Sequence, residues 1–305
     1  MTAARSRDTL IAGLRAEALA PVRDPGIRAL VAAIHARAHG PVRAVLFYGS
    51  GLWDGADPDK VQDFYALVAR QRDFDPRPVR AALARVLPPN VYYLEADADG
   101  VTYRAKVAVM RWDQFARAAR GRAATPHIWA RFAQPCRIVD ADTPARAEAT
   151  LAALADAVTT FHRKLAPLVP ADADARGFWL AGLAETYARE LRSERRDRAA
   201  AVFDADPERF AWRTACARDA MGRPTAAARR RARRRAAVAR PAGKAIALLR
   251  LMKATLTFDG GVDYILWKIE RHSGVRETPS AFTRKHPLIG GWPLLVRLYR
   301  RGAFR

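Results

Sequence analysis

Two glycines on either side of a serine, placed directly after an apolar run, constrain this chain more than any other feature. Residues 45–48 lead into Gly49, Ser50 and Gly51, and a second apolar run begins at Asp63. This order predicts a strand, a tight turn, a connecting segment and a return strand. Glycines let the main chain approach a triphosphate closely, and Mg²⁺ prefers one or two carboxylates together with substrate oxygens. The pattern therefore predicts a phosphate cradle in which Asp63 holds Mg²⁺, as nucleotidyl transfer requires.

This block resembles the nucleotidyltransferase superfamily of the DNA polymerase beta type, in which a Gly-Ser turn is followed by an acidic residue on an apolar strand. The extended form, Tyr48-Gly49-Ser50-Gly51 with Asp63-Phe64, is similar to the mitochondrial-type CDP-diacylglycerol synthase. That family is a phosphatidate cytidylyltransferase that is not an integral membrane protein. The superfamily usually carries a second acid two positions after the first, where this chain has Tyr65.

Shorter segments resemble the same family in the same order, so that the resemblance covers roughly residues 40 to 275. They are the strand-like run 101–110 with Lys106, the segment 129–135 with Arg131, the segment 180–192 with Tyr187 and Arg192, and a C-terminal pattern of Gly243-Lys244, Tyr264 and Lys268 in which the family's Lys-Gly order is reversed. The period of two places Arg104 and Lys106 on one strand face, opposite Ala105 and Val107. That basic face meets either a phosphate or solvent.

The resemblance implies CTP-dependent conversion of phosphatidic acid to CDP-diacylglycerol, with release of pyrophosphate and with Mg²⁺ or a similar ion as cofactor. Catalysis would fall to Asp63, Lys106 and Ser50. Substrate binding would fall to residues of the matching segments: Tyr48, Gly49, Ser50, Gly51, Arg131, Tyr187, Arg192 and Lys244. A single carboxylate binds a metal ion weakly, so a second ligand beside Asp63 is expected. Glu95 is the first candidate, followed by Asp54 and Asp57.

The charge of the chain predicts a polyanionic partner. A net charge of +22, from 53 Lys and Arg against 31 Asp and Glu, attracts either nucleic acid or an anionic membrane surface. The two cysteines, Cys136 and Cys216, have no metal-ligand spacing, which is typical of a reducing compartment. No apolar run approaches the ~20 residues needed to cross a bilayer, and residues 1–26 lack a signal-peptide core. We expect a cytoplasmic protein, peripheral on the inner face of a membrane.

The expected elements predict an α+β fold in three regions. Residues 1–145 alternate helices with strands and, by resemblance, form a nucleotidyltransferase domain with a mixed sheet. Residues 146–242 are almost entirely helical and resemble the winged-helix-like partner of the family. Residues 243–305 are expected to form an amphipathic, membrane-associating region. The expected helices are 5–19, 26–38, 145–158 and 177–203, the strands are 44–48, 64–68, 91–94 and 101–109, and a hairpin turn is expected at 97–100.

The Arg-rich and C-terminal segments leave alternatives open. Residues 223–240 hold eight arginines and form either a basic helix or a disordered arm. Beyond them, apolar residues with Trp267, Trp292 and Tyr299 lie beside Lys and Arg, which favours a peripheral membrane anchor, although short amphipathic helices also pack on a core.

Two other functions also stay open. One is a nucleotidyltransferase that acts on RNA or another phosphate acceptor, and the other is a non-catalytic polyanion-binding or membrane-binding module. His127, His162, His272 and His286 have no spacing typical of a site and are expected to be surface or internally hydrogen-bonded side chains.

Overall fold

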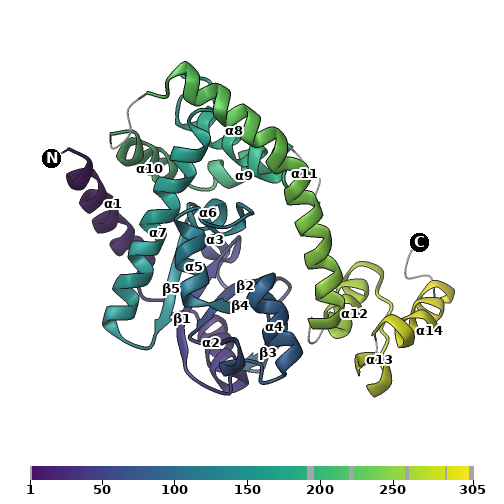
Figure 1. Ribbon diagram of the computed structural model, residues 1–305. Helices are drawn as coiled ribbons and strands as arrows, with labels where there is room; N and C mark the ends of the chain where they lie inside the picture. The colour runs from purple at the N-terminus through teal and green to yellow at the C-terminus, as the bar shows by residue number, and fades with distance from the viewer. Residues whose placement is uncertain (1, 191–195, 220–222, 258–260, 286, 302–305) are drawn as a thin grey trace.

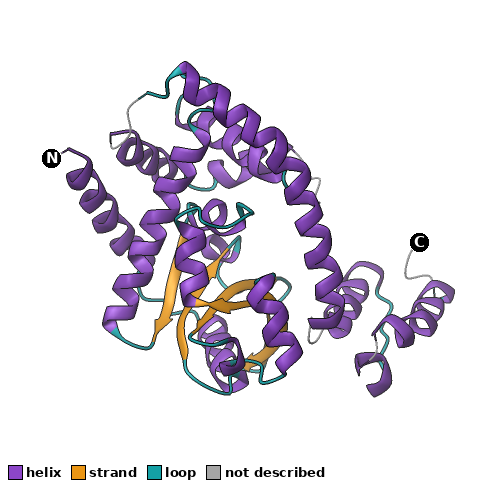
Figure 2. Cartoon of the chain, viewed as in Figure 1, coloured by secondary structure: helices purple, strands orange, loops and turns teal. Residues whose placement is uncertain are grey.

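A five-stranded mixed sheet forms the centre of the fold (Figures 1 and 2). The structure is a computed structural model that describes residues 2–190, 196–219, 223–257, 261–285 and 287–301. β2 and β4 are parallel, whereas the other neighbouring pairs are antiparallel. The α+β class is therefore confirmed. In the sheet order β3-β4-β2-β1-β5, the strands are β3 (Asn90–Ala98), β4 (Val101–Arg111), β2 (Val61–Val68), β1 (Val42–Tyr48) and β5 (Cys136–Ala141).

Helices surround the sheet and continue beyond it toward the C-terminus (Figure 1). They are α1 (Thr2–Ala18), α2 (Pro25–Arg37), α3 (Gly51–Asp54), the 3₁₀ turn η1 (Gln71–Asp73), α4 (Pro78–Val86), α5 (Trp112–Ala119), α6 (His127–Phe132), α7 (Pro144–Leu165), α8 (Ala175–Tyr187), α9 (Arg196–Asp204), α10 (Pro207–Asp219), α11 (Ala226–Thr257), α12 (Gly261–Ser273), α13 (Ala281–Lys285) and α14 (Pro287–Arg300).

The β3–β4 hairpin turns where the sequence predicts it. Asp99 and Gly100 have φ values of +52° and +77°, and left-handed angles at both central residues are typical of a two-residue turn that matches strand twist. The hairpin pairs Tyr93 with Lys106, and the parallel ladder then pairs Lys106 with Asp63. The turn sets the register of β3 on β4, and the parallel pairing of β4 with β2 places Lys106 beside Asp63.

Apolar side chains cover both faces of the sheet. On one face, Ile27, Leu30 and Ile34 of α2 pack in a cluster with Phe47 and Phe64. On the other face, the alternate residues of the same strands pack against α1, α5, α6 and α7. Because both faces are buried, β1 and β2 read as near-continuous apolar runs rather than as strict alternation.

The helices α7, α8 and α10 extend the second core away from the sheet. Phe161 of α7 stacks on Trp179 of α8, with ring centroids 4.3 Å apart. The indole N–H of Trp179 donates to the carbonyl of Phe210 on α10 at 3.1 Å. A buried ion pair of 2.6 Å between Arg213 and Glu17 then joins α10 to α1. One continuous core therefore connects the sheet with these helices.

The Arg-rich block is helical and forms the first half of α11, a helix of 32 residues. Near the other end of α11, the buried Lys253 donates from Nζ to the carbonyl of Leu87 at 2.6 Å and to Oδ1 of Asn90 at 3.0 Å. These bonds attach α11 to the β3 edge of the sheet. The helices α12 to α14 follow beyond this edge (Figure 1), and Leu266, Leu294 and Leu298 form their small core.

One expectation about the elements is wrong, and the expected strands omit β5. The single helix expected over 177–203 is interrupted, because α8 ends at Tyr187, Arg189 and Glu190 enter a turn, and α9 begins at Arg196. β5 is absent from the expectations because its six residues include Arg137 and Asp140, and its strand form depends on pairing with β1.

The three regions expected at 1–145, 146–242 and 243–305 stay a prediction. α7 packs on the sheet as well as on the later helices, and α11 continues across residue 242 without a break. Within the described residues, no helix combines the length and the hydrophobicity that a membrane span requires.

Candidate functional site

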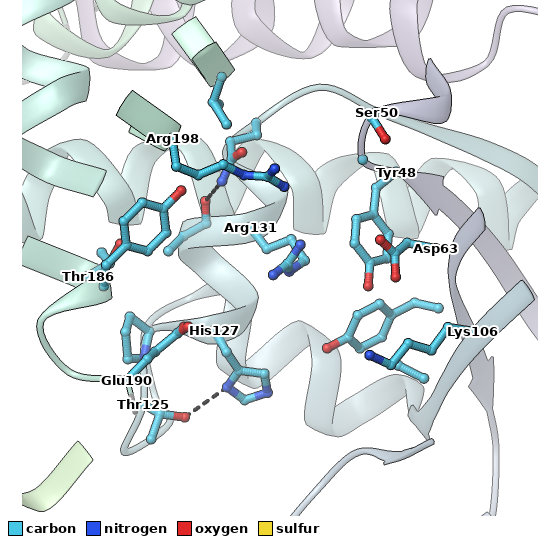
Figure 3. Close-up of a pocket in the computed structure, with 18 of the residues that line it drawn as sticks. Tyr48, Ser50, Asp63, Lys106, Thr125, His127, Arg131, Thr186, Glu190 and Arg198 are labelled. Carbon is cyan, nitrogen blue, oxygen red and sulfur yellow. Dashed lines mark hydrogen bonds between the residues drawn. The ribbon is translucent and has the colours of Figure 1, made fainter. Parts of the chain in front are cut away.

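A cavity of about 730 Å³ lies between the sheet and the helices α6, α8, α9 and α11. In the view of Figure 3, Ser50, Tyr48, Asp63 and Lys106 lie on one side of it, and His127 and Glu190 lie on the other. Arg131 projects into the space between the two sides. This cavity contains most of the described side chains that the sequence singles out.

The turn after β1 places its main chain against the Asp63 carboxylate. Tyr48 and Asp63 are opposite one another on β1 and β2, and a methyl group on Gly49 would lie 3.4 Å from Oδ2 of Asp63. Gly49 has φ +94°, a backbone angle that side chains disfavour. Gly51 has a different reason to be glycine, because a Cβ atom there would lie 2.9 Å from Cζ of Phe47. The turn and the carboxylate are thus neighbours, as the sequence predicts.

Lys106 lies next to Asp63 on the same face of the sheet. The two residues are register partners on the parallel strands β4 and β2, and both line the cavity. Ala105 and Val107 are fully buried on the opposite face, which confirms the predicted alternation. The ring of Tyr264 from α12 lies 5.7 Å from Nζ of Lys106. The Lys106 ammonium and the Asp63 carboxylate are therefore neighbours beside the glycine turn of residues 49–51.

Arg131 from α6 supplies a second cation near the centre of the cavity. Its guanidinium carbon lies 4.9 Å from the centroid of the Tyr48 ring. Burial of the guanidinium lowers the pKa of Arg131. The nearby Tyr48, Tyr65, Asp63 and Glu190 have the opposite effect and outweigh it, so that the pKa of Arg131 is raised overall. The Arg131 side chain therefore stays charged and interacts electrostatically with the carboxylates of Asp63 and Glu190.

Tyr65 is part of an aromatic wall rather than a metal ligand. Its ring contacts Tyr48 at 5.6 Å and Phe132 at 5.1 Å between centroids, and only 4% of Tyr65 is exposed. Burial raises the pKa of the phenol, so the hydroxyl is neutral at physiological pH. The position of the second acid is thus occupied by a buried, uncharged group.

Glu95 and Asp57, two of the candidates for a second metal carboxylate, lie outside the cavity lining. Glu95 accepts a hydrogen bond from the Tyr93 hydroxyl at 2.8 Å and pairs with Arg104 at 3.2 Å. Asp57 pairs with Lys60 at 3.3 Å, and the side chain of Asp54 lies outside the described residues. Among the residues that the structure describes, no group of three His, Cys, Asp or Glu side chains could hold a metal ion by itself. The donor set fits a Mg²⁺ ion that Asp63 shares with substrate phosphates.

The other candidates from the sequence are spread over the helical side. Tyr187 lines the cavity at the end of α8. Gly243 lines it from α11, whereas the neighbouring Lys244 is exposed and outside the lining. Arg192 lies outside the described residues.

Among the cavity residues that the sequence-based site does not include are the histidine, the carboxylate and the arginines His127, Glu190, Arg189, Arg198 and Arg250. A partial signal exists on α11, where Ala247, Arg250 and Leu251 have the spacing of one helix face. With Lys106 and Arg131, the described lining holds five Lys or Arg side chains against two carboxylates, Asp63 and Glu190. This excess of positive charge in an enclosed space favours an anionic ligand.

Comparison with known proteins adds no family assignment, because no protein-family model matches the chain and no curated protein matches it significantly. The fold and the cavity define a mixed α+β protein with an enclosed cationic site beside a glycine turn.

Proposed function

We propose that this chain is a Mg²⁺-dependent nucleotidyltransferase that acts at a membrane surface, with CTP as the nucleotide and phosphatidic acid as the acceptor. The observation that carries the proposal is the Asp63 carboxylate against the Gly49 turn, with Lys106 as its register partner. CTP, the lipid acceptor and the winged-helix-like role of the helical part come from the family resemblance alone.

In this proposal the turn of Gly49, Ser50 and Gly51 would hold the β and γ phosphates, and Asp63 would hold Mg²⁺ together with triphosphate oxygens. The bound ion would neutralise charge on the triphosphate and on departing pyrophosphate. Lys106 neutralises charge at the α-phosphate. An oxygen of the acceptor phosphate attacks the α-phosphorus, the bond to the β-phosphate oxygen breaks, and pyrophosphate leaves. The acceptor oxygen is already ionised near neutral pH, so no general base is required.

Charge and exposed apolar residues support a peripheral membrane location. The net charge is +22, and each basic residue near an anionic surface contributes about 1 kcal/mol. α11 also exposes Leu248, Leu249, Leu251 and Met252, each by about half or more. Leu251 belongs to the cavity lining as well, so an acyl chain leaving the cavity would meet this apolar face.

The first test measures pyrophosphate release and labelled product with each of the four nucleoside triphosphates, Mg²⁺, and either phosphatidate vesicles or RNA. We expect CDP-diacylglycerol from CTP and phosphatidate. Asp63→Ala and the isosteric Asp63→Asn should lose turnover by about 10²-fold or more, as expected when a charge that binds the transition state is removed, while vesicle binding remains. Product confined to RNA would support the RNA-acting alternative. Vesicle binding without pyrophosphate release from any nucleotide would support a non-catalytic module.

A further inference from the structure

Two buried polar atoms have no hydrogen-bond partner among the described residues: Nε2 of His127 and Nε of Arg250. Both side chains line the cavity, and the charge of Arg250 acts on His127. Buried polar atoms in folded proteins are nearly always paired, so an unpaired one requires an explanation. Two such atoms on residues that line one cavity indicate that a polar ligand binds there and supplies their hydrogen bonds.

The imidazole of His127 is held in place from its other nitrogen. Nδ1 lies 2.8 Å from the hydroxyl oxygen of Thr125, as the dashed line in Figure 3 marks. Thr125 is itself buried. When the hydroxyl donates to Nδ1, the proton of the neutral ring is on Nε2, which is then a hydrogen-bond donor. A guanidinium Nε is always a donor. In that tautomer, both unpaired atoms are donors and match a ligand that offers acceptors.

The charges around these atoms favour an anion. Burial and the nearby Arg250, Arg131 and Lys253 lower the pKa of His127 well below its usual range. Burial also lowers the pKa of Arg250, although Tyr65 and Glu190 act in the opposite direction. Cations packed this closely destabilise one another, and a phosphate dianion would relieve that repulsion while accepting both hydrogen bonds.

The triphosphate end of the proposed site is already accounted for by the Gly49 turn, Asp63 and Lys106. Nucleotidyl transfer to a phosphate needs a second anion site facing the α-phosphorus, and Arg131 stands between the two sides of the cavity in Figure 3. Leu251 follows Arg250 on α11, lines the cavity and is 61% exposed. An acceptor held by Arg250 could thus extend an apolar part outward along α11.

We propose that His127 and Arg250 bind the phosphate monoester of the acceptor, with Arg131 between this phosphate and the α-phosphate of the nucleotide. This inference rests on the proposed function, because it names the acceptor site of the same cavity. The shared chemistry is a phosphate monoester, which a lipid headgroup or a soluble metabolite could supply.

The kinetic test compares Arg250→Met and His127→Phe with the conservative Arg250→Lys and His127→Gln. Loss of a charge-assisted or buried hydrogen bond should raise KM for dioctanoyl phosphatidate by about 10- to 100-fold, with KM for CTP close to that of the unchanged protein. The conservative variants should recover part of the loss, and exposed residues outside the cavity serve as controls in Arg85→Met and His39→Phe. A rise in KM for CTP with no change for the acceptor would overturn the proposal.

A binding test does not depend on turnover, and so it separates failure of this inference from failure of the proposed function. Thermal stabilisation of the full chain is measured with dioctanoyl phosphatidate, with glycerol 3-phosphate, and with the phosphodiester dioctanoyl phosphatidylglycerol. Stabilisation by both monoesters supports the site with a soluble acceptor, and stabilisation by phosphatidate alone supports it with a lipid. Either effect should be absent in Arg250→Met and His127→Phe. Equal stabilisation by the phosphodiester, or monoester binding that survives both substitutions, would refute the site.

Discussion

Lys253 attaches α11, and with it Arg250 and Leu251, to the β3 edge of the sheet. Its Nζ donates to the carbonyls of Leu87 and Pro89 at 2.6 and 2.5 Å and to Oδ1 of Asn90 at 3.0 Å. The residue is only 6% exposed. The three hydrogens of the ammonium thus match three acceptors. Lys253→Met keeps a similar length and volume but leaves these three acceptors without their donor.

The size of the effect follows from two opposing terms. Hydrogen bonds to a charged group contribute about 1.5–3 kcal/mol each, so three of them contribute about 4.5–9 kcal/mol. Against this, burial first and then Arg250 lower the pKa of Lys253 from 10.5 to about 8, which corresponds to a cost of about 3 kcal/mol for the charged form at neutral pH. The difference predicts that Lys253→Met lowers the free energy of unfolding by about 1.5–6 kcal/mol.

Thermal unfolding followed by circular dichroism measures this change. At the about 2–4 °C per kcal/mol typical of domains of 150–250 residues, Tm should fall by about 3–24 °C. The matched control is Lys244→Met, on the same helix at an exposed position, where substitutions change stability by less than about 0.5 kcal/mol. If Lys253→Met also stayed within that range, or if Lys244→Met had the same effect, these contacts would not be what holds α11 to the sheet.

Two further predictions concern Gly49 and His162. Gly49→Ala places a side chain at φ +94° and should cost about 1–2 kcal/mol in a denaturant titration, whereas Gly291→Ala, where a Cβ would meet no atom within 4 Å, should not destabilise the protein. Equal effects of the two would remove the conformational argument for Gly49. His162 is 1% exposed, and burial lowers its pKa from 6.5 to about 4. Because the unfolded state binds the proton first as pH falls, the free energy of unfolding should decrease by up to about 3 kcal/mol between pH 6.5 and 4. His162→Gln should lack this part of the pH dependence, and an unchanged pH profile in that variant would contradict the assignment.

The sheet side of the site could be predicted from the sequence because its geometry is local. A strand has a period of two, so the sequence places Lys106 on the strand face opposite Ala105 and Val107. Asp99 and Gly100 fix the register of the β3–β4 hairpin, whereas the residue opposite Asp63 is set by the separate parallel pairing of β4 with β2. His162 is also as expected, since it is internally hydrogen-bonded to Val158 and Thr214.

The helical side could not be predicted because its residues meet only through tertiary packing. His127, Glu190 and Arg250 come from α6, from the turn after α8 and from α11, and no short-range pattern links them. The helical propensity of residues 177–203 also conceals the turn that brings Arg189 and Glu190 to the cavity. The expectation that His127 is a surface or internally satisfied residue is wrong for Nε2, which is buried without a partner within the described part of the chain.

Tyr65 explains why a single carboxylate can suit this cavity. Along β2, Asp63 and Tyr65 both line the cavity, and the Tyr65 ring also packs against Tyr48 and Phe132. An acid at position 65 would be buried within the field of Arg131, whose charge already acts on Tyr65, and an ion pair with that guanidinium would compete with metal binding. With a neutral phenol there, the Arg131 charge remains directed at the cavity. In the proposed function, the Arg131 charge lies between the two phosphates and neutralises part of the charge that a second metal ion, held by a second carboxylate, would otherwise neutralise. This substitution is possible because the reaction needs neutralised charge at the α-phosphorus more than it needs a particular ligand.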